Sequence, residues 1–472
     1  MPETPAPSGQ LTWLPAWQIR EMIGKREVSP VEVTEHFLDR IEALDPVLHA
    51  FVHVDRAGAR DAARRAERAV LAGDELGLLH GIPVAVKGHI FVTGWPTFDM
   101  GTQRDIPAAP WDDVQVERLR AAGAVVVGSN TLMGSGLRRD MARTDQTRMY
   151  NWDVEARNPW DPDKVPGWSS SGTAAAVASR MVPLGLGSDG GGSTRLPSAY
   201  SGVFGIVATP GRIPWIHPAS PTLAMTASTG PMCLDVVDGA LATQAMAGPD
   251  GRDFFSLIDQ PEDYLAHIHD GVEGLRFAWS DDLGYASMYA MEESPRVIAA
   301  IREAAQGFAR LGATVETTDQ SWDDFYEGFM FINRAFGSGG QGTGEMPSPA
   351  EYWSAMATRG RNVERFNALF EDFDVLLTPT SQLLARDVED WNRCWTGDQS
   401  GFAHGTFAPV YTSHVMLFNW LAMPAFSVPC GFVDGLPVGL QIVGKPGNET
   451  TMFKVAQAFQ KAFPRTERPP VS

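Results

Sequence analysis

The feature that most constrains this chain is the stretch GSDGGGSTR at residues 187–195, which continues the apolar run MVPLGLG at residues 181–187. The apolar run predicts a strand, and the three glycines after it predict a turn around one hydroxyl, that of Ser193. Consecutive glycines cost backbone entropy, so a folded chain keeps them where side chains would obstruct. Such a turn can direct several N–H groups into one small space, as an oxyanion hole requires. Two interpretations stay open here: a nucleophilic serine, or a phosphate-binding turn or tight bend.

Helix and strand patterns alternate along the chain. A helix is predicted from residue 30, because Ser29 and Glu32 form a capping-box pair and Pro30 occupies the first helical position. Repeated helix–strand alternation predicts an α/β protein with a largely parallel component. The other alternating segments are a helix over about 55–73, a strand within 81–92, and helix–strand units at 114–130, 171–189, 294–318 and 366–380. A Gly-rich and then Pro-rich stretch at 335–353 predicts a loop.

Composition and charge indicate which partners to expect. The 472 residues are 44% hydrophobic and 20% charged, as in an ordinary globular protein, and their formal net charge is −19. Such an acidic surface disfavours nucleic acid and anionic membranes as partners. We find neither a signal-peptide pattern nor a run of 18 apolar residues, and we expect a cytoplasmic protein. The wide spacing of the cysteines predicts neither a disulfide framework nor a zinc site; they are Cys233, Cys394 and Cys430.

Lys87 is a candidate general base. Only six of the 38 basic residues are lysines, and Lys87 lies in PVAVKGHIFV with apolar residues on both sides. Desolvation lowers the pKa of a lysine, and the neutral amine can accept a proton. The alternative is a lysine at a strand end that extends its amine to water.

Three consecutive serines, Ser169 to Ser171, precede an alanine-rich helix. One of them is expected to cap that helix. A serine nucleophile still needs a base, and neither GxSxG around Ser193 nor an SxxK motif is present, while no histidine stands in a recognisable triad motif. The residues alone therefore leave Lys87 and the serine cluster as the candidates.

These segments together resemble the amidase signature family over most of the chain. GIPVAVKG at 81–88 is similar to the family's lysine strand, and residues 156–212 are similar to its signature block. FDVLLTPT at 373–380 and residues 423–444 are similar to its C-terminal segments. The resemblance implies one large α/β domain over 1–472, with a mixed, mostly parallel, twisted sheet covered by helices on both faces. Within it we expect an N-terminal helical segment at 1–75, a catalytic core at 76–215 and substrate-shaping loops and helices at 322–425.

The resemblance also implies catalytic roles. Ser193 would be the nucleophile that forms an acyl-enzyme, Ser169 would hold a cis peptide bond and pass a proton, and Lys87 would be the base behind Ser169. The two serines are 24 residues apart (193 − 169), as in the family. No metal or cofactor is implied.

The remaining implied roles concern the turn and its surroundings. The oxyanion hole would use the N–H groups of Gly190, Gly191, Gly192 and Ser193. Asp189 and Arg195 would brace the turn as an ion pair, and Ser170 and Ser188 would add hydrogen bonds to Lys87 or the serines.

The chain departs from the family pattern at a few positions near these residues. Trp168 stands where the family commonly has glycine, and Gly88 stands where aspartate is common; Gly190 and Thr173 replace a frequent threonine and serine. Trp168 is interpreted as lining the pocket, with a packed core indole as the alternative.

Substrate preference is read from the aromatic residues of 322–356 and 391–420, which favour an apolar or aryl group, together with Met133 and Trp168 as substrate-binding residues. We expect an amidohydrolase of apolar or aryl amides that extends to carbamates (urethanes) and esters, acting as a monomer or homodimer on a small molecule. One alternative is the glutamine-hydrolysing subunit of a tRNA amidotransferase. The other is a catalytically inactive binding module.

Overall fold

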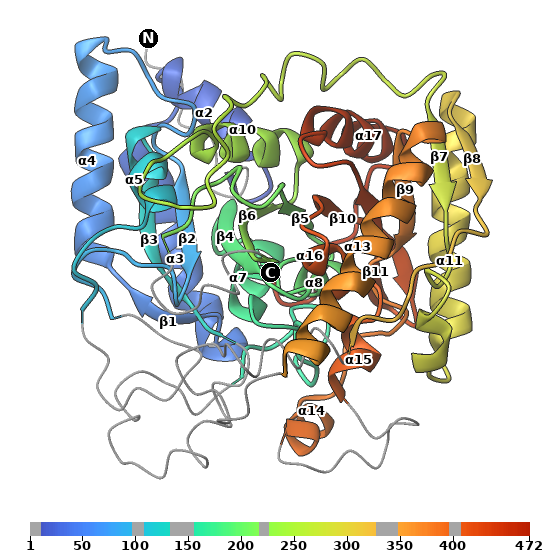
Figure 1. Ribbon diagram of the computed structural model, residues 1–472. Coiled ribbons are helices and arrows are strands. Elements are labelled where there is room, and N and C mark those ends of the chain that lie inside the picture. The colour runs from blue at the N-terminus through green and yellow to red at the C-terminus, as the bar shows by residue number, and fades with distance from the viewer. Residues whose placement is uncertain (1–10, 97–107, 133–154, 217–225, 327–347, 396–406) are drawn as a thin grey trace.

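The computed structural model describes residues 11–96, 108–132, 155–216, 226–326, 348–395 and 407–472. A single large sheet runs through this part of the chain (Figure 1). Its strands are β1 Phe51–Val54, β2 Pro83–Lys87, β3 Val125–Asn130, β4 Leu184–Asp189, β5 Phe204–Val207, β6 Ser228–Cys233, β7 Arg276–Trp279, β8 Thr314–Thr317, β9 Val375–Pro379, β10 Ala425–Val433 and β11 Leu436–Val443. Their order across the sheet is β1-β3-β2-β4-β6-β5-β10-β11-β9-β7-β8.

The sheet is mixed, as predicted. β2 pairs in parallel with β3 and β4, and β7 pairs in parallel with β8 and β9. Antiparallel pairs join these two groups through β6, β5, β10 and β11, and β1 is antiparallel to β3. In the first parallel group Val86 lies opposite Leu186, so the ends of β2 and β4 lie side by side. The predicted single α/β domain is confirmed.

Helices cover both faces of the sheet (Figure 1). The α-helices are α2 Ala16–Gly24, α3 Pro30–Leu48, α4 Arg56–Ala72, α5 Val114–Ala121, α7 Ser171–Ala178, α8 Arg195–Ser201, α10 Val236–Met246, α11 Ser294–Gln306, α13 Pro349–Asp372, α14 Val388–Trp395, α15 Phe407–Thr412, α16 Met416–Trp420 and α17 Glu449–Ala462. The 3-10 helices in the described part of the chain are η2 Ala286–Tyr289 and η3 Gly307–Leu311.

Two predicted helix starts are confirmed by their caps. The Ser29 hydroxyl accepts from the Glu32 N–H at the start of α3, and the Glu32 carboxylate accepts in return from the Ser29 N–H. Asp55 caps α4 through the Gly58 N–H. Of the predicted loop at 335–353, residues 349–353 instead belong to α13 and Ser348 caps it, while 335–347 lie outside the described residues.

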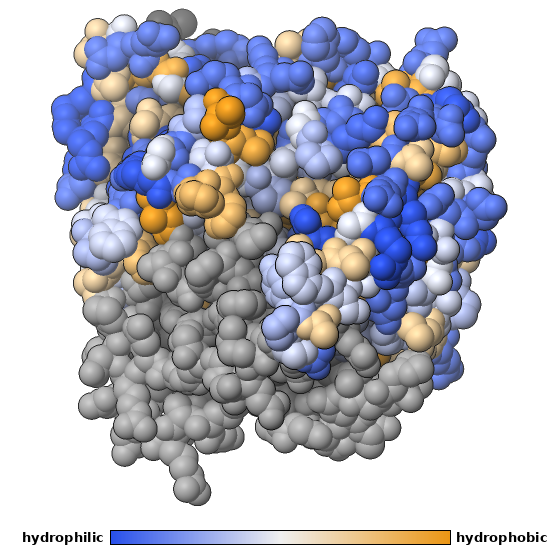
Figure 2. Space-filling view, viewed as in Figure 1, coloured by the Kyte–Doolittle hydropathy of each residue, from blue (hydrophilic) through white to orange (hydrophobic). Residues whose placement is uncertain are grey.

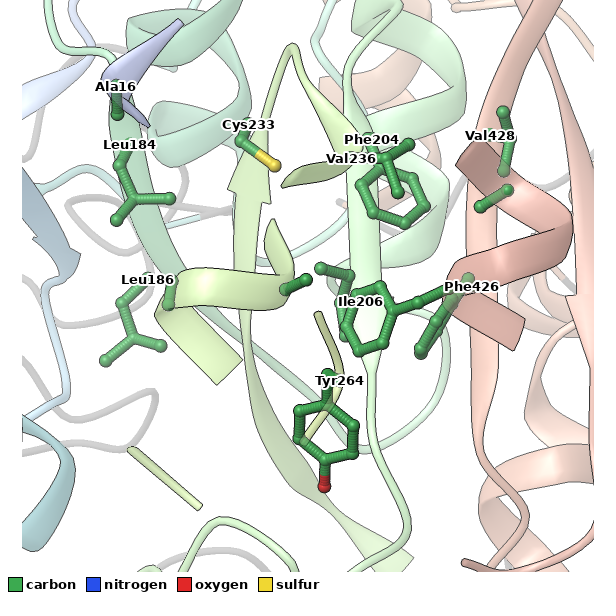
Figure 3. Packing of buried hydrophobic residues seen from close by; sticks show 14 of the residues in the cluster. Ala16, Leu184, Leu186, Phe204, Ile206, Cys233, Val236, Tyr264, Phe426 and Val428 are labelled. Carbon is green, nitrogen blue, oxygen red and sulfur yellow. The ribbon is translucent and has the colours of Figure 1, made fainter. Parts of the chain in front are cut away.

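Alternate residues of a strand pack into different hydrophobic clusters. Val84 and Val86 of β2 join a cluster with α2, α5, α10 and α17, whereas Ala85 joins a cluster with α3, α4 and α7. This alternation is what a strand buried on both faces requires. Figure 3 shows part of the first cluster, where the rings of Phe204 and Phe426 meet edge to face, 5.7 Å apart, between neighbouring strands.

The described surface in Figure 2 is largely hydrophilic, in agreement with the composition. On the face seen in Figure 2, hydrophilic residues predominate among the coloured atoms, and hydrophobic ones are interspersed between them. None of the described helices is both long enough and apolar enough to pass through a lipid bilayer.

Candidate active site

The turn that follows β4 is built around close backbone approaches. Gly192 has a φ of +99°, and a Cβ there would lie 2.4 Å from the Val415 side chain. A Cβ at Gly191 would lie 2.9 Å from Met416 Cε. Glycine is therefore needed at Gly192, because its positive φ and the contact with Val415 each exclude a side chain, whereas at Gly191 the flexible end of Met416 would have to shift. The turn carries the Ser193 side chain, which is 7% exposed, into the start of α8.

A fully buried ion pair fixes this turn. Arg195 Nε donates to Asp189 Oδ2 at 2.9 Å, and Arg195 Nη2 donates to Oδ1 at 3.0 Å, which makes a bidentate pair with neither side chain exposed. Burial alone would raise the pKa of Asp189, but the Arg195 charge and several hydrogen bonds hold it well below its ordinary value. The expected ion pair is present, and its further partners are Asn419, Gln441 and the Val415 carbonyl.

The Asp189 carboxylate also organises the backbone of the turn. It accepts the N–H groups of Gly192 at 2.6 Å, Thr194 at 3.1 Å and Arg195 at 3.2 Å. The expectation that Gly192 is an oxyanion-hole donor does not hold in this geometry, because a charged acceptor already holds its N–H. The N–H groups of Gly190, Gly191 and Ser193 donate to no acceptor among the described residues.

Lys87 ends β2 inside the protein. Its side chain is fully buried, and Nζ donates to Ser169 Oγ at 2.6 Å, to Ser188 Oγ at 2.9 Å and to the Ser188 carbonyl at 3.2 Å. Burial lowers the pKa of Lys87 to about 7, although the Asp189 charge acts in the opposite direction. The alternative of a lysine that extends to water is therefore wrong.

The serine triplet joins the lysine to the glycine turn. Ser170 N–H donates to the Ser193 carbonyl at 3.1 Å, which places the triplet beside the turn. Ser170 Oγ donates to the Ser188 carbonyl at 3.2 Å and accepts the Ser188 N–H at 3.3 Å. Ser188 therefore binds Lys87, and Ser170 binds Ser188, so both serines connect the lysine to the glycine turn.

One expectation for Ser169 is not met. The described residues contain no cis peptide bond, so the expected cis bond at Ser169 is wrong here; the trans form is the favoured one for a residue other than proline. The hydrogen bond between Lys87 and Ser169 forms with this trans backbone. Among the described residues, no hydrogen bond joins the hydroxyl groups of Ser169 and Ser193.

Trp168 lies in an aromatic cluster next to Ser169. Its ring meets Trp391 edge to face at 5.7 Å and stacks with Tyr411 at 6.3 Å, and Trp391 meets Tyr411 at 5.6 Å. Trp168 is 8% exposed, so it is packed among these rings. Met133, the other residue assigned to substrate binding, lies outside the described residues.

Sequence reasoning missed several residues of this site. Asn419 and Gln441 bind Arg195 from more than 220 residues away, and no local pattern could have found them. His89 contacts Ser188 and stands two residues after Lys87, so its place near the predicted base was a usable signal. Among the described residues, no group of three or more His, Cys, Asp or Glu side chains could hold a metal ion.

The Amidase family model matches residues 32–336 and 331–453. The chain belongs to the Amidase family. It is accordingly a hydrolase that acts on amide C–N bonds, and the match confirms the resemblance drawn from the motifs.

Similar proteins extend over nearly the whole chain. A glutamyl-tRNA(Gln) amidotransferase subunit of Symbiobacterium thermophilum is 31% identical, with 97% of this chain and 98% of the relative covered. A chain from a solved vestigial protein complex, which is said to reveal the evolutionary origins of an s-triazine catabolic enzyme, is 26% identical with a TM-score of 0.79. The match covers 97% of this chain and 100% of that one. A bacterial aryl acylamidase structure, 24% identical with a TM-score of 0.79, covers 97% of this chain and 98% of its own and shows the same fold.

Proposed function

We propose that this amidase hydrolyses apolar or aryl amides through an acyl-enzyme on Ser193, with Ser169 and Lys87 as a proton relay. The observation that carries the proposal is the buried Lys87 amine, which lies 2.6 Å from Ser169 Oγ and binds no carboxylate of the described residues. A lysine whose pKa is lowered to about 7 by burial is neutral in a large fraction of molecules near neutral pH. Such an amine has a lone pair that can accept a proton.

The reaction is written as two acyl transfers. Lys87 takes the proton of Ser169, Ser169 takes the proton of Ser193, and Ser193 Oγ forms a bond to the substrate carbonyl carbon. The C–N bond then breaks, and the relay returns the proton to the leaving amine. Water adds to the acyl-enzyme through the same relay, which releases the carboxylic acid and restores the Ser193 hydroxyl.

The oxyanion is assigned to N–H groups that no carboxylate occupies. Gly190, Gly191 and Ser193 keep this role, and Gly192 is removed from it because its N–H binds Asp189. Donors of this kind stabilise the negative charge that develops on the carbonyl oxygen.

The preference for apolar or aryl groups rests on the surroundings of the serines. Trp168, Trp391 and Tyr411 form an aromatic cluster next to Ser169, and Met416 lies against Gly191 of the turn. Arg195 is bound to Asp189, so its charge is already paired. Carbamates and esters belong to the same proposal, since the same acyl chemistry serves all three bond types.

A panel of butyryl p-nitroanilide, a p-nitrophenyl carbamate, p-nitrophenyl butyrate and glutamine tests this proposal. We expect the wild type to cleave the anilide or the carbamate, and Ser193→Ala and Lys87→Ala to lose this activity at least about a thousandfold. Survival of anilide cleavage in Ser193→Ala would overturn the assignment of the nucleophile. Ester cleavage that survives in Lys87→Ala would show that another base serves Ser193.

Glutamine hydrolysis within a multisubunit amidotransferase is a second candidate. It is favoured by relatives such as the Symbiobacterium protein, which match this chain over nearly its full length. Turnover of glutamine with no turnover of the aryl substrates would support it. In that case the expectation of a monomer or homodimer, and of no contact with nucleic acid, would give way to an assembly with partner subunits.

A further inference from the structure

His89 is a buried histidine that the proposed relay does not use. Its Nε2 lies 3.0 Å from Ser188 Oγ, and Ser188 Oγ lies 2.9 Å from Lys87 Nζ. The imidazole stacks on the Trp215 indole, with ring centres 5.5 Å apart and planes at 19°. With only 8% of its surface exposed, the ring is held on one face by Trp215 and at its edge by Ser188.

The hydrogen bonds of a neutral Lys87 can be counted. The amine has two N–H groups and one lone pair, and the lone pair must face Ser169 if Lys87 is to take its proton. The Ser188 carbonyl can only accept, so it binds one N–H. The second N–H needs an acceptor, and the Ser188 hydroxyl oxygen is in reach.

The Ser188 hydroxyl must then donate its own hydrogen to another acceptor. Apart from Lys87, the acceptor for it among the described residues is His89 Nε2. If Nε2 carries no proton, it accepts from Ser188, and the Lys87 lone pair stays directed at Ser169. If Nε2 is protonated, it donates to Ser188 Oγ, and the Ser188 hydrogen points at the lone pair that Ser169 needs.

We propose that His89 is a positioning residue: its unprotonated Nε2 fixes the direction of the hydrogen bonds through Ser188 and so directs the Lys87 lone pair at Ser169. This inference rests on the proposed function, because it assumes that Lys87 acts on Ser169. Protonation of His89 in acid would reverse the chain of hydrogen bonds and switch off the base in addition to the titration of Lys87 itself.

The groups that face this cluster are few in the described part of the chain. Lys87 reaches His89 through Ser188, Asp189 acts on Lys87, and Asp113 interacts with Trp215 on the side of the stacked ring. Burial raises the pKa of Asp113 to about 7, against the effects of a hydrogen bond from the Phe91 N–H and of Trp215. Below that pH the Asp113 carboxyl is largely uncharged.

Variants of His89 test the inference in the full-length enzyme, with butyryl p-nitroanilide and p-nitrophenyl butyrate as substrates from pH 5 to 10. His89→Leu removes the acceptor, and we expect kcat to fall about tenfold or more with KM within about twofold. His89→Gln supplies an acceptor that does not titrate. We expect kcat near the wild-type value and a decrease of activity in acid that reflects one protonation instead of two. His80→Gln is the matched control, because His80 is equally buried but binds the Ala66 carbonyl away from the relay.

A double-mutant cycle with Ser188→Ala separates positioning from packing. Since His89 acts through the Ser188 hydroxyl, His89→Leu should cause no further loss of kcat in the Ser188→Ala background. An undiminished loss there, equal losses in the Gln and Leu variants, or wild-type kcat and pH profile in both would overturn the inference. If thermal unfolding shows that His89→Leu does not fold, the inference is tested by comparing the pH profiles of His89→Gln and the control His80→Gln.

Ser193→Ala distinguishes this failure from failure of the proposed function. If that variant still cleaves both substrates, the relay itself is wrong whatever His89 does. If Ser193→Ala is inactive while the His89 variants have the wild-type kcat and pH profile, only the positioning role of His89 is wrong.

Discussion

Two buried cations lie close together in this protein and behave in opposite ways. Arg195 and Lys87 both have side chains with no exposed surface. The Asp189 carboxylate accepts from Nε and Nη2 of Arg195, and this pair holds the pKa of the Asp189 carboxyl well below its ordinary value. Lys87 is bound by two oxygens of Ser188 and one of Ser169, and burial lowers its pKa to about 7. Equal burial therefore gives a permanent charge where a bidentate counter-ion is present and a titratable amine where hydroxyl and carbonyl oxygens are the partners.

The two side chains therefore have different roles, one structural and one in proton transfer. The ion pair holds the turn in one conformation, since Asp189 also binds three backbone N–H groups of residues 192–195. The Lys87 amine is available for proton transfer because none of the carboxylates in the described part of the chain binds it. Predictions that alter one cation and leave the other in place test this division.

The largest expected effect is on activity in Lys87→Met. We expect kcat for the anilide to fall at least about a thousandfold, because Ser169 loses its proton acceptor, while the fold persists. Kinetics and far-ultraviolet circular dichroism check this. Lys461→Met, at an exposed lysine of α17, is the matched control and should keep wild-type kcat. Equal activity in the two variants would remove Lys87 from the mechanism.

Arg195→Met should have the largest effect on stability. It leaves the Asp189 charge buried and unpaired, and we expect the free energy of unfolding in urea to fall by about 3–5 kcal/mol. The control is Arg296→Met, which breaks an exposed ion pair with Asp434 and should cost about 1 kcal/mol or less. Similar losses in both variants would mean that the buried pair does not hold the turn.

The pH dependence of stability should show that protonated Lys87 lowers the free energy of unfolding. Its pKa is lowered in the folded state, so between about pH 7 and pH 10 the unfolded chain binds a proton that the folded chain lacks. The free energy of unfolding therefore rises with pH across that window, by up to about 1.4 kcal/mol per pH unit. Below pH 7 Lys87 is protonated in both states, and the loss of stability that its burial causes has its full size. Lys87→Met should lack this rise in urea unfolding at a series of pH values, whereas Lys461→Met should keep it. An identical slope in Lys87→Met would contradict the lowered pKa.

The smallest of these effects is the position of the acid limb of kcat/KM. With Lys87 titrating near pH 7, activity should fall at least tenfold per pH unit well below that pH. The midpoint should move little with added salt, because the amine is buried away from screening ions. A limb near pH 4 would point to a carboxylate as the base.

The local parts of the site could be predicted from the sequence. The three glycines before Ser193, the serine triplet and the lysine in an apolar strand each follow from local chemistry, and the capping box at Ser29 fixed a helix start. The single α/β domain also follows, because alternating helices and strands have few other ways to bury their apolar faces.

Long-range partners could not be predicted. Asn419 and Gln441 complete the environment of Arg195 from elements far along the chain, and the antiparallel middle of the sheet depends on how β10 and β11 insert beside β5 and β9. Helix–strand alternation indicates parallel pairing and carries no signal for this insertion.

The sequence by itself determined which chemical groups are present and which segments carry them: a serine in a glycine turn, a second serine before a helix and an isolated lysine. Only the tertiary structure decided the states of those groups. It buried Lys87 against oxygens and Arg195 against a carboxylate, it assigned the Gly192 N–H to Asp189, and it placed His89 behind Ser188. The physical reason is that a pKa and a hydrogen-bond direction depend on every partner around a group, and those partners come together only when the sheet is complete.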